Sequence, residues 1–322
     1  MIFHFLTRDI SNLYNHPRME KKNEGNHMSP TIRTKAICMV SAIFILYVLH
    51  LYVIHLGSAL GEAKRSKGTK AKISFKSYDS PVEALEDVLK EKPKIIGIGE
   101  YHQNQENSKI PSSMQRFTNE MLPVLKDKVS DLLLETWIVD KKCGEVEEKA
   151  VTQMDQTLDK PETTEDELVS LVKTSRKLGI TPHILKFTCQ DYQSFYVDNE
   201  IQFGTLLELI TERLKSKATT IFEKKDPASD KMIMLYGGLI HNTLYPPDPY
   251  ERKYSYALSL KELTHDHYIE LDMIVPEYVE KDPAITRQSW FKTYKKKGSS
   301  RQTFLINPRP FYYVMVLPRT TP

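Results

Sequence analysis

The sequence IIGIGEYH at residues 95–102 decides the fold class, because a short apolar run is followed directly by polar residues. A continuous apolar run that ends in glycine is typical of a strand in a parallel sheet covered on both faces. The glycines let the backbone turn sharply, so that the next side chains lie over the carboxyl edge of the sheet. In open α/β sheets, ligands bind at that edge.

A second segment, MIMLYGGLIH at residues 232–241, repeats this pattern. In both segments, a histidine stands three positions after the last glycine. Parallel strands place their carboxyl ends at the same edge of a sheet. We therefore expect His102 and His241 to lie at one site.

Strand-like and helix-like segments alternate along most of the chain. Strands are predicted at 94–98, 131–135, 180–187, 232–236, 268–274 and 311–317, and helices at 80–89, 117–125, 164–178, 201–217 and 254–263. The polar stretch 141–161 shows no clear periodicity and is predicted to be a flap or an insert. The alternation predicts an α/β fold, doubly wound, with a mostly parallel sheet, helices on both faces and right-handed crossovers.

One hydrophobic helix is predicted ahead of this domain, at residues 36–60. Residues 36–56 are almost entirely apolar and are about as long as a bilayer-spanning helix. The sequence thus divides into a disordered basic N-terminus (1–35), a transmembrane anchor or signal segment (36–60), a linker (61–72) and the α/β domain (73–322).

The hydrophobic segment predicts a single-pass membrane protein that contacts lipid through this helix, with the main domain outside the cytoplasm. Small residues at 57–59 resemble a cleavage site, so secretion after cleavage is the alternative. The apolar run exceeds a usual signal core, which favours the uncleaved anchor. Basic residues flank the hydrophobic segment on both sides and leave the membrane orientation open. The choice of Met1 or Met28 as the start is also open.

Composition argues against a nucleic-acid partner and does not decide the state of the cysteines. The chain has 45 Lys and Arg against 42 Asp and Glu, a net charge of +3, so no nucleic-acid partner is expected. Of the three cysteines, Cys143 and Cys189 lie outside the hydrophobic segment, and no C-x-x-C motif occurs. A disulfide between these two and a pair of free thiols are both compatible with the sequence.

The polar residues at the predicted strand ends form a candidate site. These are Glu100, His102, Glu135 and His241. Two imidazoles with carboxylates suit a divalent transition metal, for which we expect Glu100, His102 and His241 as ligands. Without a metal, the same residues suit acid–base catalysis, with a histidine that takes a proton from water and a glutamate that orients it.

At these residues, the chain resembles the superfamily that joins the Tiki/TraB proteins, the ChaN haem-binding lipoproteins and the erythromycin-esterase-like hydrolases. The sequence GEYH at 99–102 resembles Gly-Glu-x-His of ChaN-like members and the first Gly-x-x-His of Tiki-like members. LLLE at 132–135 resembles their second-strand motif, and GLIH at 238–241 resembles the second Gly-x-x-His. The resemblance spans residues 80–275 and implies functional roles for the four site residues.

The resemblance also implies two further contacts. Tyr101 is a candidate axial haem ligand or hydrogen-bonding group, with plain packing as the alternative, and Arg116 is a candidate for binding an anionic group. One residue separates Glu100 from His102, where esterase-like members have two, and Gln103 stands where many ChaN-like members have an acid. We therefore predict a membrane-anchored hydrolase that cleaves an ester or amide bond of a small-molecule or peptide substrate. The alternative is a ChaN-type protein that binds haem or iron without catalysis.

Overall fold

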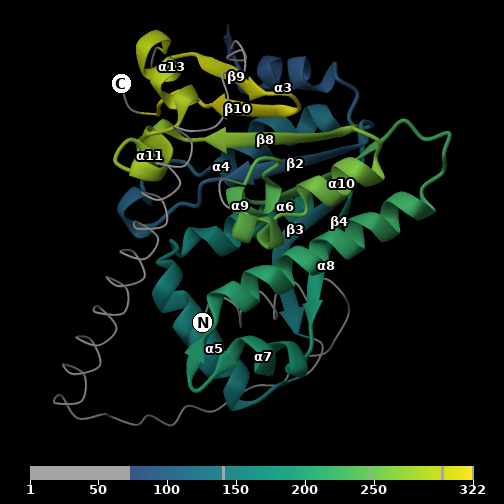
Figure 1. The fold of residues 1–322 in the computed structure, drawn as a ribbon, viewed down its shortest axis with the longest axis vertical. Helices are drawn as coiled ribbons and strands as arrows, with labels where there is room; N and C mark the ends of the chain where they lie inside the picture. The colour runs from purple at the N-terminus through teal and green to yellow at the C-terminus, as the bar shows by residue number, and fades with distance from the viewer. Residues whose placement is uncertain (1–72, 140–141, 247–248, 299–300, 321–322) are drawn as a thin grey trace. The chain divides into compact units, whose positions relative to one another are not determined.

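The computed structural model describes residues 73–322, except 140–141, 247–248, 299–300 and 321–322. Its central feature is an eight-stranded sheet with the order β1-β9-β10-β8-β2-β7-β3-β4 (Figure 1). The strands are β1 (Ser74–Tyr78), β2 (Ile95–Glu100), β3 (Val129–Val139), β4 (Thr181–Phe187), β7 (Met232–Gly238), β8 (Tyr268–Ile274), β9 (Thr303–Arg309) and β10 (Tyr312–Val316). The six strands from β10 to β4 are parallel, and β9 pairs antiparallel with both β1 and β10. The predicted α/β fold with a mostly parallel sheet is confirmed.

Helices cover both faces of the sheet, and each face has its own apolar core. The first face packs against α3 (Pro81–Leu89), α4 (Ser113–Arg116) with the turns that follow it, α6 (Thr163–Lys177), α11 (Pro276–Val279), α12 (Pro283–Thr286) and α13 (Ser289–Lys297). The second face packs against α5 (Glu145–Leu158), α7 (Cys189–Phe195), α8 (Phe203–Lys224) and α10 (Ala257–Leu263). The short helix α9 (Leu239–Asn242) continues directly from β7, and β5 (Tyr196–Val197) and β6 (Glu200–Ile201) form a separate ribbon.

The order of the strands places the site between β2, β7 and β3. The chain leaves β2 through α4 toward the first face, whereas it leaves β7 through α9 and α10 toward the second face. Where crossovers from adjacent parallel strands leave toward opposite faces, a crevice forms outside the carboxyl ends of those strands. The two motifs singled out in the sequence end at this point.

The glycines of β2 and β7 allow close packing of side chains and do not adopt a positive φ. Gly238 has φ −69° and ψ 151°, and the positive-φ glycines among the described residues are Gly144 and Gly179. The glycines of β2 instead make room for side chains: a methyl group on Gly97 would lie 1.8 Å from Asn242 Oδ1, and one on Gly99 would lie 2.8 Å from Asp272 Oδ1. The chain does turn directly from β7 into α9 at Gly238, but without a positive φ, and close packing explains the glycines of β2.

Two further segments differ from the prediction. The stretch 141–161, predicted to be a flap, contains the 14-residue helix α5, which buries Ala150, Val151 and Met154 against the sheet. The edge strands β1 and β9 were not predicted. A disulfide joins Cys143, just before α5, to Cys189 at the start of α7, with a Cα–Cα distance of 5.2 Å.

The predicted N-terminal regions, 1–35, 36–60 and 61–72, lie outside the described residues. Within the described part of 73–322, no helix has the length and apolar character needed to cross a bilayer.

Candidate active site

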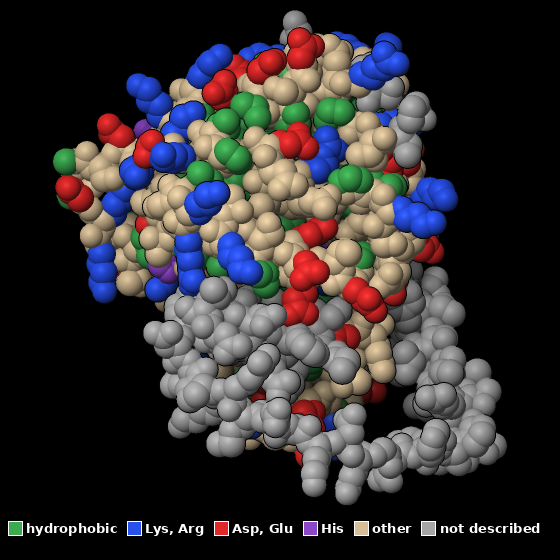
Figure 2. All heavy atoms as spheres, turned by 180° about the vertical axis from the view of Figure 1, so that it is seen from behind, with side chains coloured by type: hydrophobic (Ala, Val, Ile, Leu, Met, Phe, Trp, Pro, Cys, Tyr) green, Lys and Arg blue, Asp and Glu red, His purple; other side chains and the backbone are tan. Residues whose placement is uncertain are grey.

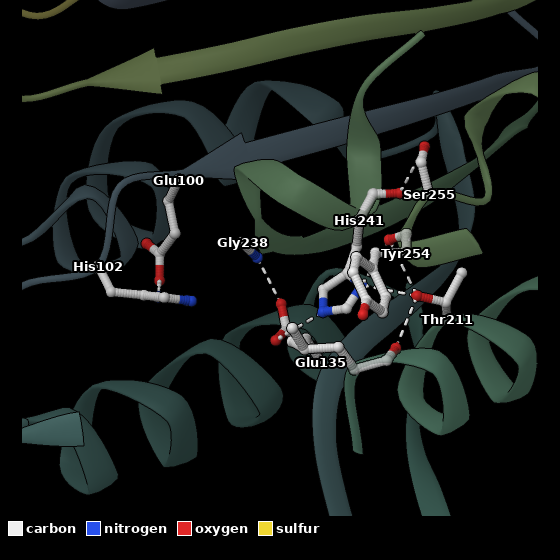
Figure 3. Close-up of polar contacts among 9 residues, drawn as sticks. Glu100, His102, Glu135, Thr211, Gly238, His241, Tyr254 and Ser255 are labelled. Atoms are coloured by element: carbon white, nitrogen blue, oxygen red, sulfur yellow. Dashed lines mark hydrogen bonds and ion pairs between the residues drawn. The ribbon is translucent and has the colours of Figure 1, made fainter. Parts of the chain in front are cut away.

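Glu100 and His102 form the first pair of the site, at the end of β2 (Figure 3). Glu100 is buried, and its Oε1 lies 3.0 Å from His102 Nδ1. Its Oε2 accepts a 2.6 Å hydrogen bond from the hydroxyl of Tyr236 on β7. Because a carboxylate can only accept hydrogen bonds, Nδ1 of the neutral imidazole carries the proton, and Nε2 keeps its lone pair.

The hydroxyl of Tyr236 holds the Glu100 carboxylate in place. Burial, and next the neighbouring Glu100 charge, raise the pKa of Tyr236 well above its ordinary value, so the phenol stays a hydrogen-bond donor. The His102 side chain is 41% exposed, against 8% for Glu100. The imidazole is therefore anchored on its inner nitrogen and open to a ligand on its outer one.

Glu135 and His241 form the second pair. His241 is fully buried, and its Nε2 lies 3.3 Å from Glu135 Oε1, an ion-pair distance without the alignment of a full hydrogen bond. Its Nδ1 lies 3.0 Å from the carbonyl oxygen of Tyr254 and 2.8 Å from Thr211 Oγ1. A carbonyl oxygen can only accept, so Nδ1 carries the proton toward Tyr254, and Thr211 donates its single hydroxyl proton to the carbonyl of Leu207 or of Tyr254.

Both ring nitrogens of His241 thus face acceptors, and only the imidazolium form satisfies them. Burial alone would lower the pKa of His241, but the Glu135 charge and the contacts with Glu135 and Tyr254 raise it. Burial alone would raise the pKa of Glu135, but His241, then His102 and the backbone N–H of Gly238, hold it well below its usual range. The second pair is therefore a buried ion pair with Gly238 N–H as an additional donor to Glu135 Oε2.

The glycine pair at the end of β7 brings the two pairs together. Side chains alternate along a strand, so Tyr236 reaches Glu100 on one face while Gly237 lies against Glu135 on the other. A methyl group on Gly237 would lie 2.5 Å from Glu135 Oε2. One on Gly238 would lie 2.9 Å from His102 Nε2 and 3.4 Å from Glu135 Oε2. The open nitrogen of His102 and the Glu135 carboxylate therefore share the space above Gly238.

A pocket opens at this point, between the sheet edge and the segments that follow β2 and β3. It is lined by the end of α5, the start of α6 and the loop after His102. Its titratable lining residues are Glu100, His102, Glu135, Asp155, Lys160, Glu165, Glu167 and Tyr236. His241 lies on the side of Glu135 away from His102 and is not among the lining residues of the pocket (Figure 3).

The residues predicted as metal ligands do not form one group. Glu100 and His102 are a pair, whereas His241 is separated from them by Glu135. A metal ligand must offer a lone pair, and both nitrogens of His241 face acceptors. Among the residues that the structure describes, there is no group of three or more His, Cys, Asp or Glu side chains placed to hold a metal. The side chains as arranged here do not fit the predicted metal centre.

The two further predicted contacts are not in the pocket lining. Tyr101 packs against the core of the first face, and burial, then the neighbouring Asp282, raise its pKa to about 12. Arg116 is buried, and its Nη1 donates a 2.8 Å hydrogen bond to the carbonyl of Pro318. In this arrangement, Arg116 anchors the C-terminal segment to α4.

Several residues of the site were not predicted from the sequence. Tyr236 stands directly before the glycine pair of β7, and Ser112 donates a 2.5 Å hydrogen bond to Glu167 across the pocket. Tyr236 could have been found, because it places a hydroxyl on the same strand face as the apolar residues Met232 and Met234, directly before the glycine pair. Ser112 and Glu167 are 55 positions apart, and no local pattern connects them.

Comparison with known proteins gives no relative for this chain: no family model, no curated protein and no solved structure matches it. The functional argument therefore depends on the site itself.

Proposed function

We propose that the domain is a hydrolase in which His102 activates water for attack on an ester or amide bond. The observation that supports this is the arrangement of the Glu100–His102 pair. Glu100 Oε1 accepts a hydrogen bond from His102 Nδ1–H at an N···O distance of 3.0 Å, which leaves the Nε2 lone pair toward the pocket. A carboxylate that fixes the tautomer of a histidine in this way is the arrangement that makes imidazole a general base.

The proposed reaction uses these side chains and water. Water donates one proton to His102 Nε2 while its oxygen attacks the substrate carbonyl. The imidazolium that forms is stabilised by Glu100 on one side and by Glu135 on the other. As the tetrahedral intermediate collapses, His102 returns the proton to the leaving oxygen or nitrogen, which restores the neutral ring.

Glu135 acts by its fixed charge. Its carboxylate is held by the His241 imidazolium and by Gly238 N–H, so it stays ionised above its lowered pKa. It is thus available to stabilise positive charge on His102 in the transition state. His241 is a positioning residue in this scheme, because it touches Glu135 and the backbone and not the pocket.

A location outside the cytoplasm, with the hydrophobic segment 36–60 as anchor, is part of the same proposal. The disulfide between Cys143 and Cys189 supports it, because such bonds persist in oxidising compartments. The ChaN-type alternative, haem binding without catalysis, is tested by adding haem and recording the absorption spectrum. A Soret band that is lost in His102→Ala would support that alternative.

The test of the hydrolase is activity against a panel of p-nitrophenyl esters and p-nitroanilides. His102→Asn keeps a donor near Glu100 but removes the base, and we expect it to lower kcat/KM by roughly 100-fold or more. The matched control is His267→Asn, the same change at an exposed histidine next to the start of β8, at the opposite edge of the sheet. Equal activity in the His102 and His267 variants would refute the proposal.

A further inference from the structure

The residue next to His102 has a buried acceptor with no donor. Gln103 Oε1 is buried and receives no hydrogen bond from the described residues. Its amide nitrogen donates to the carbonyl of Asn107 at 3.0 Å and to the carbonyl of Ile110 at 2.7 Å. Exchanging the amide oxygen and nitrogen would set the oxygen against two carbonyl oxygens, so the orientation of this amide is fixed.

Gln103 stands where two pockets meet. It lines the pocket of the His102 site and also a second pocket bounded by the loop 108–111 and the start of α6. Glu167 is the other residue that lines both pockets. The Oε1 atom of Gln103 and the carboxylate of Glu167 thus offer two acceptors at one junction. A buried acceptor without a donor costs free energy, which a ligand with N–H groups would recover.

The charge at this junction favours a cation. Five carboxylates line the pocket of the His102 site (Glu100, Glu135, Asp155, Glu165 and Glu167), against Lys160 in the lining and the His241 imidazolium that pairs with Glu135. Burial raises the pKa of Glu167, the hydrogen bond from Ser112 opposes this, and the Glu100 charge adds to the rise, which a bound cation would reverse. On one face of the molecule, Figure 2 shows Asp and Glu side chains next to one another, with Lys and Arg spread around them. A group of carboxylates attracts a cation over some distance.

We propose that the junction of Gln103 and Glu167 binds a primary ammonium or guanidinium group, so that the substrate of the His102 site is a cationic ester or amide. An ammonium carries three donors and a guanidinium five, which suits two neighbouring acceptors of which one is charged. The catalytic part rests on the hydrolase proposed above, but binding of the cation can be measured separately.

Binding is tested on the full chain by calorimetric titration with pentane-1,5-diamine and with pentane-1,5-diol, which has the same length without the charge. We expect the diamine to bind at least roughly 10-fold more tightly than the diol. We expect Glu167→Gln to weaken diamine binding roughly 10-fold, and Gln103→Met to weaken it roughly 3- to 10-fold. The control Glu162→Gln makes the same change at an exposed site at the start of α6 that lines neither pocket. Equal binding of diamine and diol, or diamine binding unchanged in Glu167→Gln, would overturn the proposal.

A second measurement separates this inference from the proposed function. We expect the p-nitrophenyl ester of Nα-acetyl-lysine to be cleaved with a higher kcat/KM than the norleucine ester, and Glu167→Gln to remove the difference. Hydrolysis of both esters at equal rates, dependent on His102, would refute the cation site and leave the hydrolase standing. Binding of the diamine as predicted without hydrolysis of either ester would support the cation site and refute the hydrolase.

Discussion

Replacing Glu135 by glutamine tests whether His241 carries a charge in the folded protein. In the wild type, the buried imidazolium of His241 lies 3.3 Å from the Glu135 carboxylate. The glutamine amide has the same shape and still accepts the Gly238 N–H, but it removes the negative charge. In the variant, the neutral ring of His241 keeps its Nδ1–H donor to Tyr254, and the new amide N–H faces Nε2. The cost at high pH is therefore modest, about 1 kcal/mol.

The pH dependence of this cost gives the sharper result. In the wild type, the pKa of His241 is raised, so its contribution is fully present below the unfolded value of about 6.5 and is lost as the pH rises through the folded value. In the variant, the Glu135 charge is gone, and burial, which lowers the pKa of His241, is opposed by the Tyr254 contact alone. The variant thus loses stability as the pH falls below 6.5, because the unfolded chain then binds a proton that the native state does not.

The loss of wild-type stability at high pH and the loss of variant stability at low pH both make the difference in unfolding free energy between wild type and Glu135→Gln larger at low pH. Each pH unit over which the folded and unfolded states differ by one proton changes the stability by about 1.4 kcal/mol. We therefore expect Glu135→Gln to destabilise the protein more at pH 5 than at pH 8, by about 1.4 kcal/mol or more. Urea unfolding at pH 5, 6, 7 and 8 measures this, with the exposed Glu162→Gln as control. A difference that is the same at every pH would refute the charged state of His241.

Three further perturbations have defined outcomes. Removing the disulfide with Cys143→Ser and Cys189→Ser opens a loop with a sequence separation of 46, and we expect a loss of about 4 kcal/mol in urea unfolding; an unchanged midpoint would contradict this. Gly237→Ala places a methyl group 2.5 Å from Glu135 Oε2 and should lower stability by about 1–3 kcal/mol in thermal unfolding, whereas a neutral effect would show that the carboxylate can move aside. Burial raises the pKa of Asp272, so its folded form holds a proton that the unfolded chain releases above about pH 4. Asp272→Asn should therefore become more stable relative to the wild type as the pH rises from 4 to 7, by up to about 1.4 kcal/mol per unit, and parallel stability curves would contradict this.

The alternation of strands and helices was sufficient to predict the fold class, because the central strands β2, β7 and β8 are buried at every position and β2 and β7 read as apolar runs. The helix α5 was missed although its apolar residues Val146, Ala150, Val151 and Met154 recur at helical spacing. The many charged residues between them hid this stripe. The edge strand β1 is half-exposed and short, so its pattern SFKSY carries little signal.

The edge of the sheet where the site lies could be predicted, but not the pairing of its residues. The end of a predicted strand indicates which edge of the sheet a side chain reaches. The face of the sheet on which it lies depends on the register of that strand with its neighbours. A register shift follows Leu134 in β3, and Glu135 lies on the face opposite to Glu100. His241 consequently meets Glu135 and not His102. The contacts that fix its protonation come from Thr211 and Tyr254, and no sequence pattern links these to the strand.

The tautomer of His102 tests the central claim most directly, because it requires no knowledge of the substrate. Long-range ¹H–¹⁵N NMR spectra of the wild type and of His102→Asn identify the two ring nitrogens of His102. At a pH where the ring is neutral, we expect a protonated Nδ1, hydrogen-bonded to Glu100, and a bare Nε2 toward the pocket. A protonated Nε2 with a bare Nδ1 would contradict the proposal that Glu100 orients His102 as a base.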